Sequence, residues 1–142
     1  MNRLVYTAIS PSANETIYTQ YSYDALGNPT RVVSGLTNLL DQTSPIPEDA
    51  WYVNYIYDKL GRLTNTQTPD SLSETYEYDY RNRLVKLINK QNNDTTYSYD
   101  NFDNITSVQS GNMCTNYTYN IVGMRTSMAD STGTTNYTYS PF

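Results

Sequence analysis

Four aspartates recur at nearly regular intervals, and their carboxylates are the groups in this sequence best placed to do chemistry. They are Asp24, Asp58, Asp79 and Asp100, and the same column continues as Asn120. Calcium is the first ligand to consider, but a hard cation needs about six to eight oxygen ligands and each repeat supplies one carboxylate. Replacement by an amide also fits a hydrogen-bonding role better than a charged one. We therefore predict no metal site and assign these side chains to the capping of backbone turns.

Other catalytic groups are scarce. The chain has no histidine, which removes the commonest general base and transition-metal ligand. It also lacks a glycine-rich phosphate loop, a nucleophile elbow and a dinucleotide fingerprint. The pair Glu48-Asp49 could serve glycoside hydrolysis only across a cleft, and Cys114 has no basic neighbour to activate it, which suggests a small strand residue. We predict that the chain is not an enzyme and has no catalytic residue and no cofactor.

The amino-acid composition limits the classes of protein to which this chain could belong. The 142 residues include 16 Tyr against 2 Phe and 1 Trp, and the formal net charge is -5. A chain this rich in aromatic and β-branched residues is typical of folded β structure. Nucleic acid is not expected as a partner because no basic patch is visible. The sequence shows neither an apolar stretch long enough to span a membrane nor a signal peptide in this segment.

One short phrase, Tyr-x-Tyr followed by Asp or a substitute, recurs six times. The first tyrosines of successive phrases are 34, 21, 21, 20 and 20 residues apart, which is typical of stacked copies of one structural unit. Two tyrosines separated by one residue project from the same face of a strand and are suited to cross-strand packing. These pairs, the predicted source of cohesion, are Tyr21 and Tyr23, Tyr55 and Tyr57, Tyr76 and Tyr78, Tyr97 and Tyr99, Tyr117 and Tyr119, and Tyr137 and Tyr139.

A second column lies three residues after the Asp column. Only Gly, Asn and Asp occur there, and these residue types tolerate positive φ best. Asp at the start and Gly at the end indicate a tight hairpin turn, with a looser connection to the next hairpin. The predicted positive-φ residues are Gly27, Gly61, Asn82, Asp103 and Gly123.

The predicted fold is therefore all-β, an antiparallel meander of repeated β-hairpins forming a curved sheet, a partial shell or a β-solenoid. The strand after each turn carries apolar columns three residues apart, such as Leu63 and Thr66. Residues three apart point to opposite faces of a regular strand. Either a bulge lies between the two columns or both faces are partly covered.

An insertion of some fourteen residues interrupts the array at about 36–50. Its prolines, Pro45 and Pro47, exclude a central strand, and residues 37–42 could form a short helical turn. The insertion is either an inert surface excursion from the array or a docking loop.

Residues 55–64, YIYDKLGRLT, closely resemble the YD repeat of the rearrangement-hotspot (RHS) proteins, and residues 21–30 and 97–106 are looser copies. The resemblance covers nearly the whole chain from Tyr21 onward. It implies a long β-sheet that spirals into a hollow shell, as in bacterial polymorphic toxins, insecticidal toxin complexes and animal teneurins. The proline- and aspartate-rich motif that closes such shells is missing here, as is an effector domain.

The implied function is a non-catalytic structural segment of an RHS-type shell that encapsulates or presents a toxin or adhesive domain. Its implied partners are the remainder of such a shell and a toxin cargo, in a secreted or cell-surface location as part of a longer bacterial protein. One alternative is an aromatic repeat module that binds glycans or cell-wall polymers. The other is a filament subunit whose edge strands, about 134–140 of one copy and 3–9 of the next, pair with each other.

The expected organisation is one repeat array over residues 1–142. Asn2-Arg3-Leu4-Val5 duplicates Asn82-Arg83-Leu84-Val85, so the chain is expected to open inside a turn and to be a piece of a longer array. The predicted boundaries are 1–20 for a truncated repeat, 21–54 for the repeat with the insertion, 55–75, 76–96, 97–116 and 117–136 for regular repeats, and 137–142 for a second truncated repeat.

Overall fold

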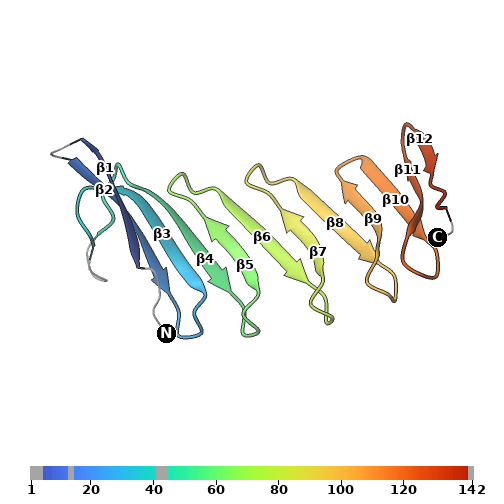
Figure 1. Ribbon diagram of the computed structural model, residues 1–142, viewed down its shortest axis with the longest axis horizontal. Helices are drawn as coiled ribbons and strands as arrows, with labels where there is room; N and C mark the ends of the chain where they lie inside the picture. Colours follow the sequence, from blue (N-terminus) through green and yellow to red (C-terminus); the bar gives the residue numbers. More distant parts are fainter. Residues whose placement is uncertain (1–4, 13–14, 41–44, 141–142) are drawn as a thin grey trace. The chain divides into compact units, whose positions relative to one another are not determined.

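The structure is a computed structural model that describes residues 5–12, 15–40 and 45–140 of the chain. These residues form β-strands, turns and irregular segments, without a helix (Figure 1). The chain divides into two compact units, Met1–Ser73 and Glu74–Phe142. The prediction of an all-β antiparallel meander of hairpins is confirmed, because within each unit consecutive strands of the sequence pair with each other in antiparallel fashion.

The first unit holds five strands, each antiparallel to the next. They are β1 (Tyr6–Ser12), β2 (Glu15–Tyr23), β3 (Pro29–Leu36), β4 (Trp51–Tyr57) and β5 (Leu63–Gln67).

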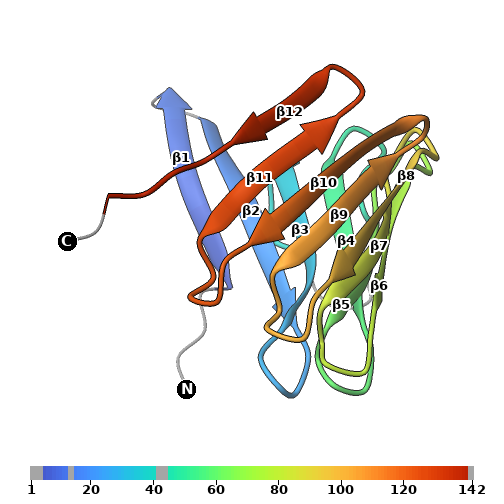
Figure 2. The same ribbon diagram turned by 90° about the vertical axis from the view of Figure 1, so that its right-hand side faces the viewer.

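The second unit continues the same pattern. Its pairing runs from β6 to β12 in chain order, and Figure 2 shows β10, β11 and β12 side by side in alternating directions. The strands are β6 (Ser73–Tyr78), β7 (Leu84–Ile88), β8 (Asp94–Tyr99), β9 (Ile105–Ser110), β10 (Met113–Tyr119), β11 (Arg125–Asp130) and β12 (Gly133–Asn136).

The connections after β5 and β7 are closed by the same backbone hydrogen bonds as the turns within hairpins, so the expectation of looser connections was wrong at these positions. Between β5 and β6 the N–H of Ser71 donates to the carbonyl of Thr68 at 3.1 Å, and that of Thr68 to the carbonyl of Leu72 at 3.0 Å. Asn89 and Asn93 close the connection between β7 and β8 in the same way, at 2.9 Å. Side chains stabilise both connections. Asn89 Oδ1 accepts the N–H groups of Gln91 and Asn93, as an aspartate does at the other end of the hairpins, whereas the hydroxyl of Thr68 donates to the carbonyl of Leu72 and to Asp70 Oδ1.

The insertion folds back against the sheet and is not an excursion from it. Its attachment is a pair of hydrogen bonds between the side-chain amide of Gln20 on β2 and the backbone of Leu40. Gln20 Nε2 donates to the carbonyl of Leu40 at 2.8 Å, and the N–H of Leu40 donates to Gln20 Oε1 at 2.9 Å. The described residues of the predicted helical turn, 37–40, form bends and irregular backbone, and the rest of that prediction lies outside the described residues.

The apolar core of the described residues lies under this insertion. Val33 and Leu36 on β3 and Ala50 at the end of the insertion are 3%, 1% and 5% exposed. Tyr18, Leu40, Ile46 and Tyr52 pack against them. Val33 pairs with Gln20 and Tyr52, whereas its neighbour Val32 pairs with Tyr21, so the insertion covers the face opposite the tyrosine pairs.

The last tyrosine pair differs from the expected pattern. β12 ends at Asn136, and residues 137–140 are not in a strand, although the predicted strand ran to Ser140. In β4 the second tyrosine, Tyr57, pairs only with the following strand, through Leu63. β12 pairs with β11 and has no following strand among the described residues, so the backbone around Tyr137 and Tyr139 has no second ladder to join.

Candidate functional site

The Asp turns are the most regular feature of the structure, and the turn of residues 58–62 shows their geometry. The N–H of Gly61 donates to the carbonyl of Asp58 at 3.0 Å, and the N–H of Asp58 donates to the carbonyl of Arg62 at 2.9 Å. Asp58 Oδ1 accepts the N–H groups of Leu60 and Arg62 at 2.9 and 3.0 Å. This is a three-residue hairpin loop, a type I turn completed by a residue in the left-handed region.

The same backbone closure recurs at the predicted turns of both units. In each, the N–H of the positive-φ residue donates to the carbonyl of the capping residue three positions earlier, at 3.0–3.3 Å. The φ values are 98° for Gly27, 79° for Gly61, 66° for Asn82, 67° for Asp103 and 80° for Gly123. The capping residues are Asp24, Asp58, Asp79, Asp100 and Asn120.

A donor side chain four residues after each aspartate completes the cap. Arg62 Nε donates to Asp58 Oδ2 at 2.7 Å, and Asn28 Nδ2 donates to Asp24 Oδ2 at 2.8 Å. Arg83 and Asn104 do the same for Asp79 and Asp100, at 2.7 and 2.9 Å. Where Asn120 replaces the aspartate, Met124 occupies the fourth position and only its backbone N–H bonds to the cap, at 3.0 Å.

These contacts lower the pKa of each capping carboxyl below its ordinary value of 3.8. At Asp24 and Asp100 the largest cause is the side-chain amide of Asn28 and of Asn104. At Asp58 it is the backbone N–H of Arg62. At Asp79 desolvation is the largest single effect and raises the pKa, but the hydrogen bonds and charge of Arg83 outweigh it.

The tyrosine pairs share their face with two apolar columns, because a bulge in the strand after each turn shifts the register. Ile56 pairs with Asn65 while Tyr57 pairs with Leu63, which leaves Thr64 as an extra residue. With the bulge, Tyr55 lies opposite Thr66, so Leu63 and Thr66 both lie on the tyrosine face. Of the two explanations that the sequence left open, the bulge is the observed one. The extra residue is β-branched in every copy: Thr30, Thr64, Val85, Thr106 and Thr126.

In the second unit the second tyrosine of a pair connects its hairpin to the preceding one. The hydroxyl of Tyr99 donates to the carbonyl of Leu84 at 2.7 Å, and that of Tyr119 to the carbonyl of Ile105 at 2.8 Å. Tyr139 does the same with the carbonyl of Arg125, at 2.7 Å. Each carbonyl lies beside a bulge and outside the ladder between the two hairpins, so the hydroxyl supplies a bond where the ladder has stopped.

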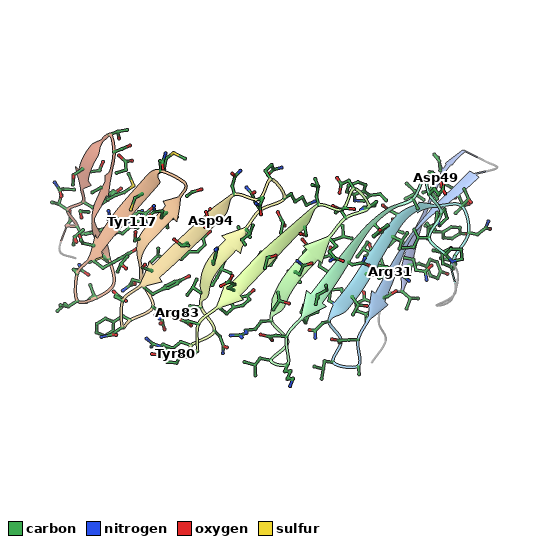
Figure 3. The ribbon with its side chains drawn as sticks, turned by 180° about the vertical axis from the view of Figure 1, so that it is seen from behind. Arg31, Asp49, Tyr80, Arg83, Asp94 and Tyr117 are labelled. Carbon is green, nitrogen blue, oxygen red and sulfur yellow. The ribbon has the colours of Figure 1, made fainter. Side chains whose placement is uncertain are left out.

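Arg83 extends this connection to the turns. Its guanidinium bonds to Asp79 and also reaches the neighbouring turn, where Nη1 donates to the carbonyl of Asp100 at 2.9 Å and to Asp103 Oδ1 at 2.8 Å. It also lies over the ring of Tyr99, 4.7 Å from the centroid. Figure 3 labels Arg83 at the turn end of the hairpins. The side-chain hydrogen bond that Arg83 donates to Asp79 is the largest cause of the raised pKa of Arg83.

The structure places the remaining candidates as follows. Glu48 and Asp49 are exposed in a turn of the insertion, and Cys114 is half-buried on β10. Across the described part of the chain, His, Cys, Asp and Glu side chains form no group able to hold a metal ion. Eleven residues of the tyrosine pairs are half-buried, and Tyr139 is 47% exposed. No described helix is long and apolar enough to cross a membrane.

Sequence reasoning missed two groups of side chains. The first is the donor column Asn28, Arg62, Arg83 and Asn104, whose signal was the loss of a donor at Met124 where the aspartate is also lost. The second is the tyrosine hydroxyls. The signal there was that the second residue of all six pairs is Tyr and never Phe, although Phe would be sufficient for packing alone.

Replacing Tyr99 with phenylalanine tests the hydroxyl bond. The change keeps the ring and removes the donor to the carbonyl of Leu84, so we expect a loss of about 0.5–1.5 kcal/mol in the free energy of unfolding. Tyr97→Phe is the matched control on the same strand, because the Tyr97 hydroxyl makes no hydrogen bond to a described residue. Chemical denaturation measures both variants, and equal losses would contradict the assignment.

The pKa shifts predict how stability depends on pH. The aspartate carboxyls have lowered pKa values in the folded state, so their contribution is present above the unfolded pKa and is lost as pH falls below 3.8 through the folded values. Desolvation raises the pKa of Tyr57 and Tyr99, so their contribution is lost as pH rises above 10.0. Thermal melting against pH should therefore fall at both extremes.

The double variant Asp24→Asn, Asp100→Asn isolates the acid part of this profile. Asn120 shows that an amide can hold the same turn through backbone N–H groups at 3.0–3.1 Å. The variant should be less stable at neutral pH and lose less stability than the parent between pH 5 and 2. An unchanged acid profile would show that other carboxyls cause the transition.

Comparison with known proteins agrees with this architecture. Residues 57–94 match the family model described as RHS Repeat. No curated protein matches the sequence. The fold is similar to part of the crystal structure of TcdB2-TccC3 without the hypervariable C-terminal region, with a TM-score of 0.65 and 14% identity over 84% of this chain. It is also similar to part of the crystal structure of TcdB2-TccC3-Cdc42, with a TM-score of 0.51 and 16% identity over 82% of this chain.

This chain spans 6% and 7% of the lengths of those two chains. At such identities the likeness concerns the fold alone, and the family match rests on the repeat itself. That match covers Tyr57 to Asp94, which includes two complete Asp turns and the strands between them. The chain therefore contains a segment, residues 57–94, that matches the RHS repeat.

Proposed function

We propose that this chain is a non-catalytic structural segment of an RHS-type shell, which encapsulates or presents a toxin or adhesive domain as part of a longer protein. The observation that supports this most directly is the bond between neighbouring hairpins, from the Tyr99 hydroxyl to the carbonyl of Leu84. Each hairpin has its own capped turn, and in the second unit Tyr99, Tyr119 and Tyr139 each bond to the hairpin before their own. Repetition of such units can extend the wall of a shell, because each repeat is stabilised by contacts with the repeats next to it.

The hydrogen bonds of the aspartate carboxylates favour a structural role in the shell over a role in an active site. Asp58 and Asp79 are engaged with the backbone N–H groups of their own turns and with an arginine at 2.7 Å. A general acid or nucleophile needs a carboxyl directed at a substrate in a cleft. We propose that these groups serve the turns alone.

The proposed partners are adjoining strands of a longer RHS-type shell and the cargo inside it, in a secreted or cell-surface location. The complete product of the gene provides the test. Limited proteolysis should leave the proposed cargo intact in the parent protein and expose it in a variant with Gly61→Val and Gly123→Val, which disrupts two turns. Equal cleavage of the cargo in both proteins would overturn encapsulation.

The repeat boundaries can be tested by deletion within this chain. Removing residues 76–96, one whole proposed repeat, should leave a folded protein because the strands on either side keep their alternation. Removing residues 76–85 should unfold it, because that deletion joins half a hairpin to an unmatched strand. Circular dichroism and thermal melting distinguish the two, and a folded half-repeat deletion would contradict the boundaries.

The glycan-binding alternative receives less support. A sugar platform needs exposed aromatic faces, whereas Tyr97 and Tyr99 are half-buried and the Tyr99 hydroxyl is bonded to the backbone. Desolvation raises the pKa of Tyr99, which is expected for a ring inside the fold. Screening against cell-wall glycans should detect no binding, and saturable binding that Tyr97→Ala abolishes would favour the alternative.

A further inference from the structure

The two ends of the hairpins in the second unit have opposite chemistry. At the Asp-turn end the loops carry large apolar side chains that are almost fully exposed: Tyr80 at 90%, Phe102 at 83%, Ile121 at 100% and Val122 at 69%. We call these four side chains the apolar turn edge. At the other end the one large exposed apolar side chain among the described residues of this unit is Met113, at the start of β10. The loop residues there are polar or small, namely Lys90, Gln91, Gly111, Asn112, Ser131 and Thr132.

This asymmetry needs a reason, because exposed loop positions are normally polar. The cap requires only the residues that begin and end each turn, and Asn101 shows that a polar residue is tolerated between them. Contiguous exposed apolar side chains on an otherwise polar protein mark an interaction surface. Figure 3 shows Tyr80 at the outer end of its turn, beyond Arg83, with Asp94 toward the opposite end of the hairpins.

The charges beside the apolar turn edge are paired within it. Arg83 bonds to Asp79 and Asp103 at 2.7 and 2.8 Å, and Arg81 lies 3.3 Å from Asp103. Burial of an unpaired charge would oppose association, but here each arginine already has a carboxylate partner. The apolar turn edge can therefore be buried in an interface without leaving the guanidinium of Arg81 or Arg83 unpaired.

The edge also contains a recess. Two adjacent turns border a hollow of 310 Å³ that is lined by Phe102, Asn104, Asn120, Ile121, Val122 and Gly123. Its lining combines the apolar residues Phe102, Ile121 and Val122 with the polar residues Asn104 and Asn120. A hollow with a mixed apolar and polar lining suits an aromatic ring that carries a hydroxyl, and Tyr80 is a side chain of that kind.

We propose that a second copy of this chain docks on the apolar turn edge, with a two-fold axis through the turn of residues 100–104. The two-fold places Phe102 against the Phe102 of the second copy and Tyr80 of each copy in the hollow beside Ile121 and Val122 of the other. The turns follow one another at two strand spacings, about 10 Å. Only a partner with the same spacing matches all three turns, and a second copy has it by construction.

The area agrees with a reversible dimer. Aromatic side chains bury about 150–250 Å² each, so four apolar side chains from each of two copies bury on the order of 1,000 Å². This lies at the lower end for specific interfaces, so association should depend on concentration. In the first unit, Leu26 and Leu60 repeat the pattern at 79% and 72% exposure, so the same chemistry recurs in the other half of the chain.

Sedimentation velocity of the full chain over a wide concentration range tests the proposal. The parent protein should form a dimer, and Phe102→Asp should weaken it by about tenfold or more, since two carboxylates would then face each other on the axis. Met113→Asp is the matched control, because Met113 is 70% exposed at the opposite end of the hairpins. A monomer at every concentration, or an equal effect of Met113→Asp, would overturn the proposal.

Cross-linking tests the two-fold geometry independently of affinity. In a Cys114→Ser background, Phe102→Cys should form a disulfide-linked dimer on mild oxidation, because the proposed axis brings the two copies together at that residue. Gln91→Cys, exposed at the other end, should remain largely monomeric. Association that survives Phe102→Asp and gives no Phe102→Cys dimer would assign self-assembly to the strand edges and refute docking at the turns. Far-ultraviolet circular dichroism should show that all variants are folded.

Discussion

Replacing Leu36 with alanine is expected to lower the free energy of unfolding of the first unit by about 2–5 kcal/mol, the largest effect of any single change considered for this chain. Leu36 is 1% exposed and is the most deeply buried large side chain among the described residues. It packs with Val33 and Ala50 under the insertion. Truncation of the Leu36 side chain would leave a cavity in the apolar cluster that packs the insertion against the sheet.

Leu39→Ala is the matched control for this prediction. Leu39 lies three residues further along the chain and is 46% exposed, so its truncation removes little buried surface. Chemical denaturation followed by the fluorescence of Trp51, at the end of the insertion, measures both variants. If the two leucines gave equal losses, the cluster under the insertion would not be the core of the unit.

Replacing Gly61 with valine is expected to cost about 1–3 kcal/mol, because a β-branched residue is strongly disfavoured at positive φ. The φ of Gly61 is 79°, and a Cβ built there would meet only Asn28 Nδ2, at 3.9 Å. The site has room for a side chain, so the cost arises from backbone conformation and not from a clash. Lys59→Val, two positions earlier and exposed, should have a much smaller effect.

The next Asp turn of the chain indicates a substitution of Gly61 that should be tolerated. Asn82 occupies the equivalent position in the next Asp turn with a φ of 66°, so Gly61→Asn should keep most of the stability that Gly61→Val loses. Thermal melting of the three variants provides the ranking. Equal shifts for Gly61→Val and Lys59→Val would refute the role of positive φ in this turn.

The turn of residues 58–62 could be predicted from the sequence because every interaction that defines it lies within five residues. Asp58 caps Leu60 and Arg62, and Gly61 provides the φ that closes the loop. Local hydrogen bonding and steric preference depend on residue type alone. The alternation of the tyrosine pairs was predictable for a similar reason, since adjacent residues of a strand always point to opposite faces.

The bulge in the strand after the turn could not be predicted from the sequence. A separation of three between Leu63 and Thr66 allowed either a bulge or two covered faces, and no local rule decides between them. The structure decides it through the pairing of Tyr57 with Leu63 and of Tyr55 with Thr66. Register between strands is a property of the ladder as a whole, so it cannot be assigned from one strand.

The periodic β-hairpin array and its capped turns follow from the order of the residues alone, because those features repeat and depend on neighbours in the chain. The attachment of the insertion could be seen only in the folded protein, since Gln20 bonds to Leu40 across 20 residues. The same holds for the bonds of Arg83 to two turns and for the bond of Tyr99 to the preceding hairpin. These contacts depend on how one hairpin aligns with the next, and residue spacing alone does not specify that alignment.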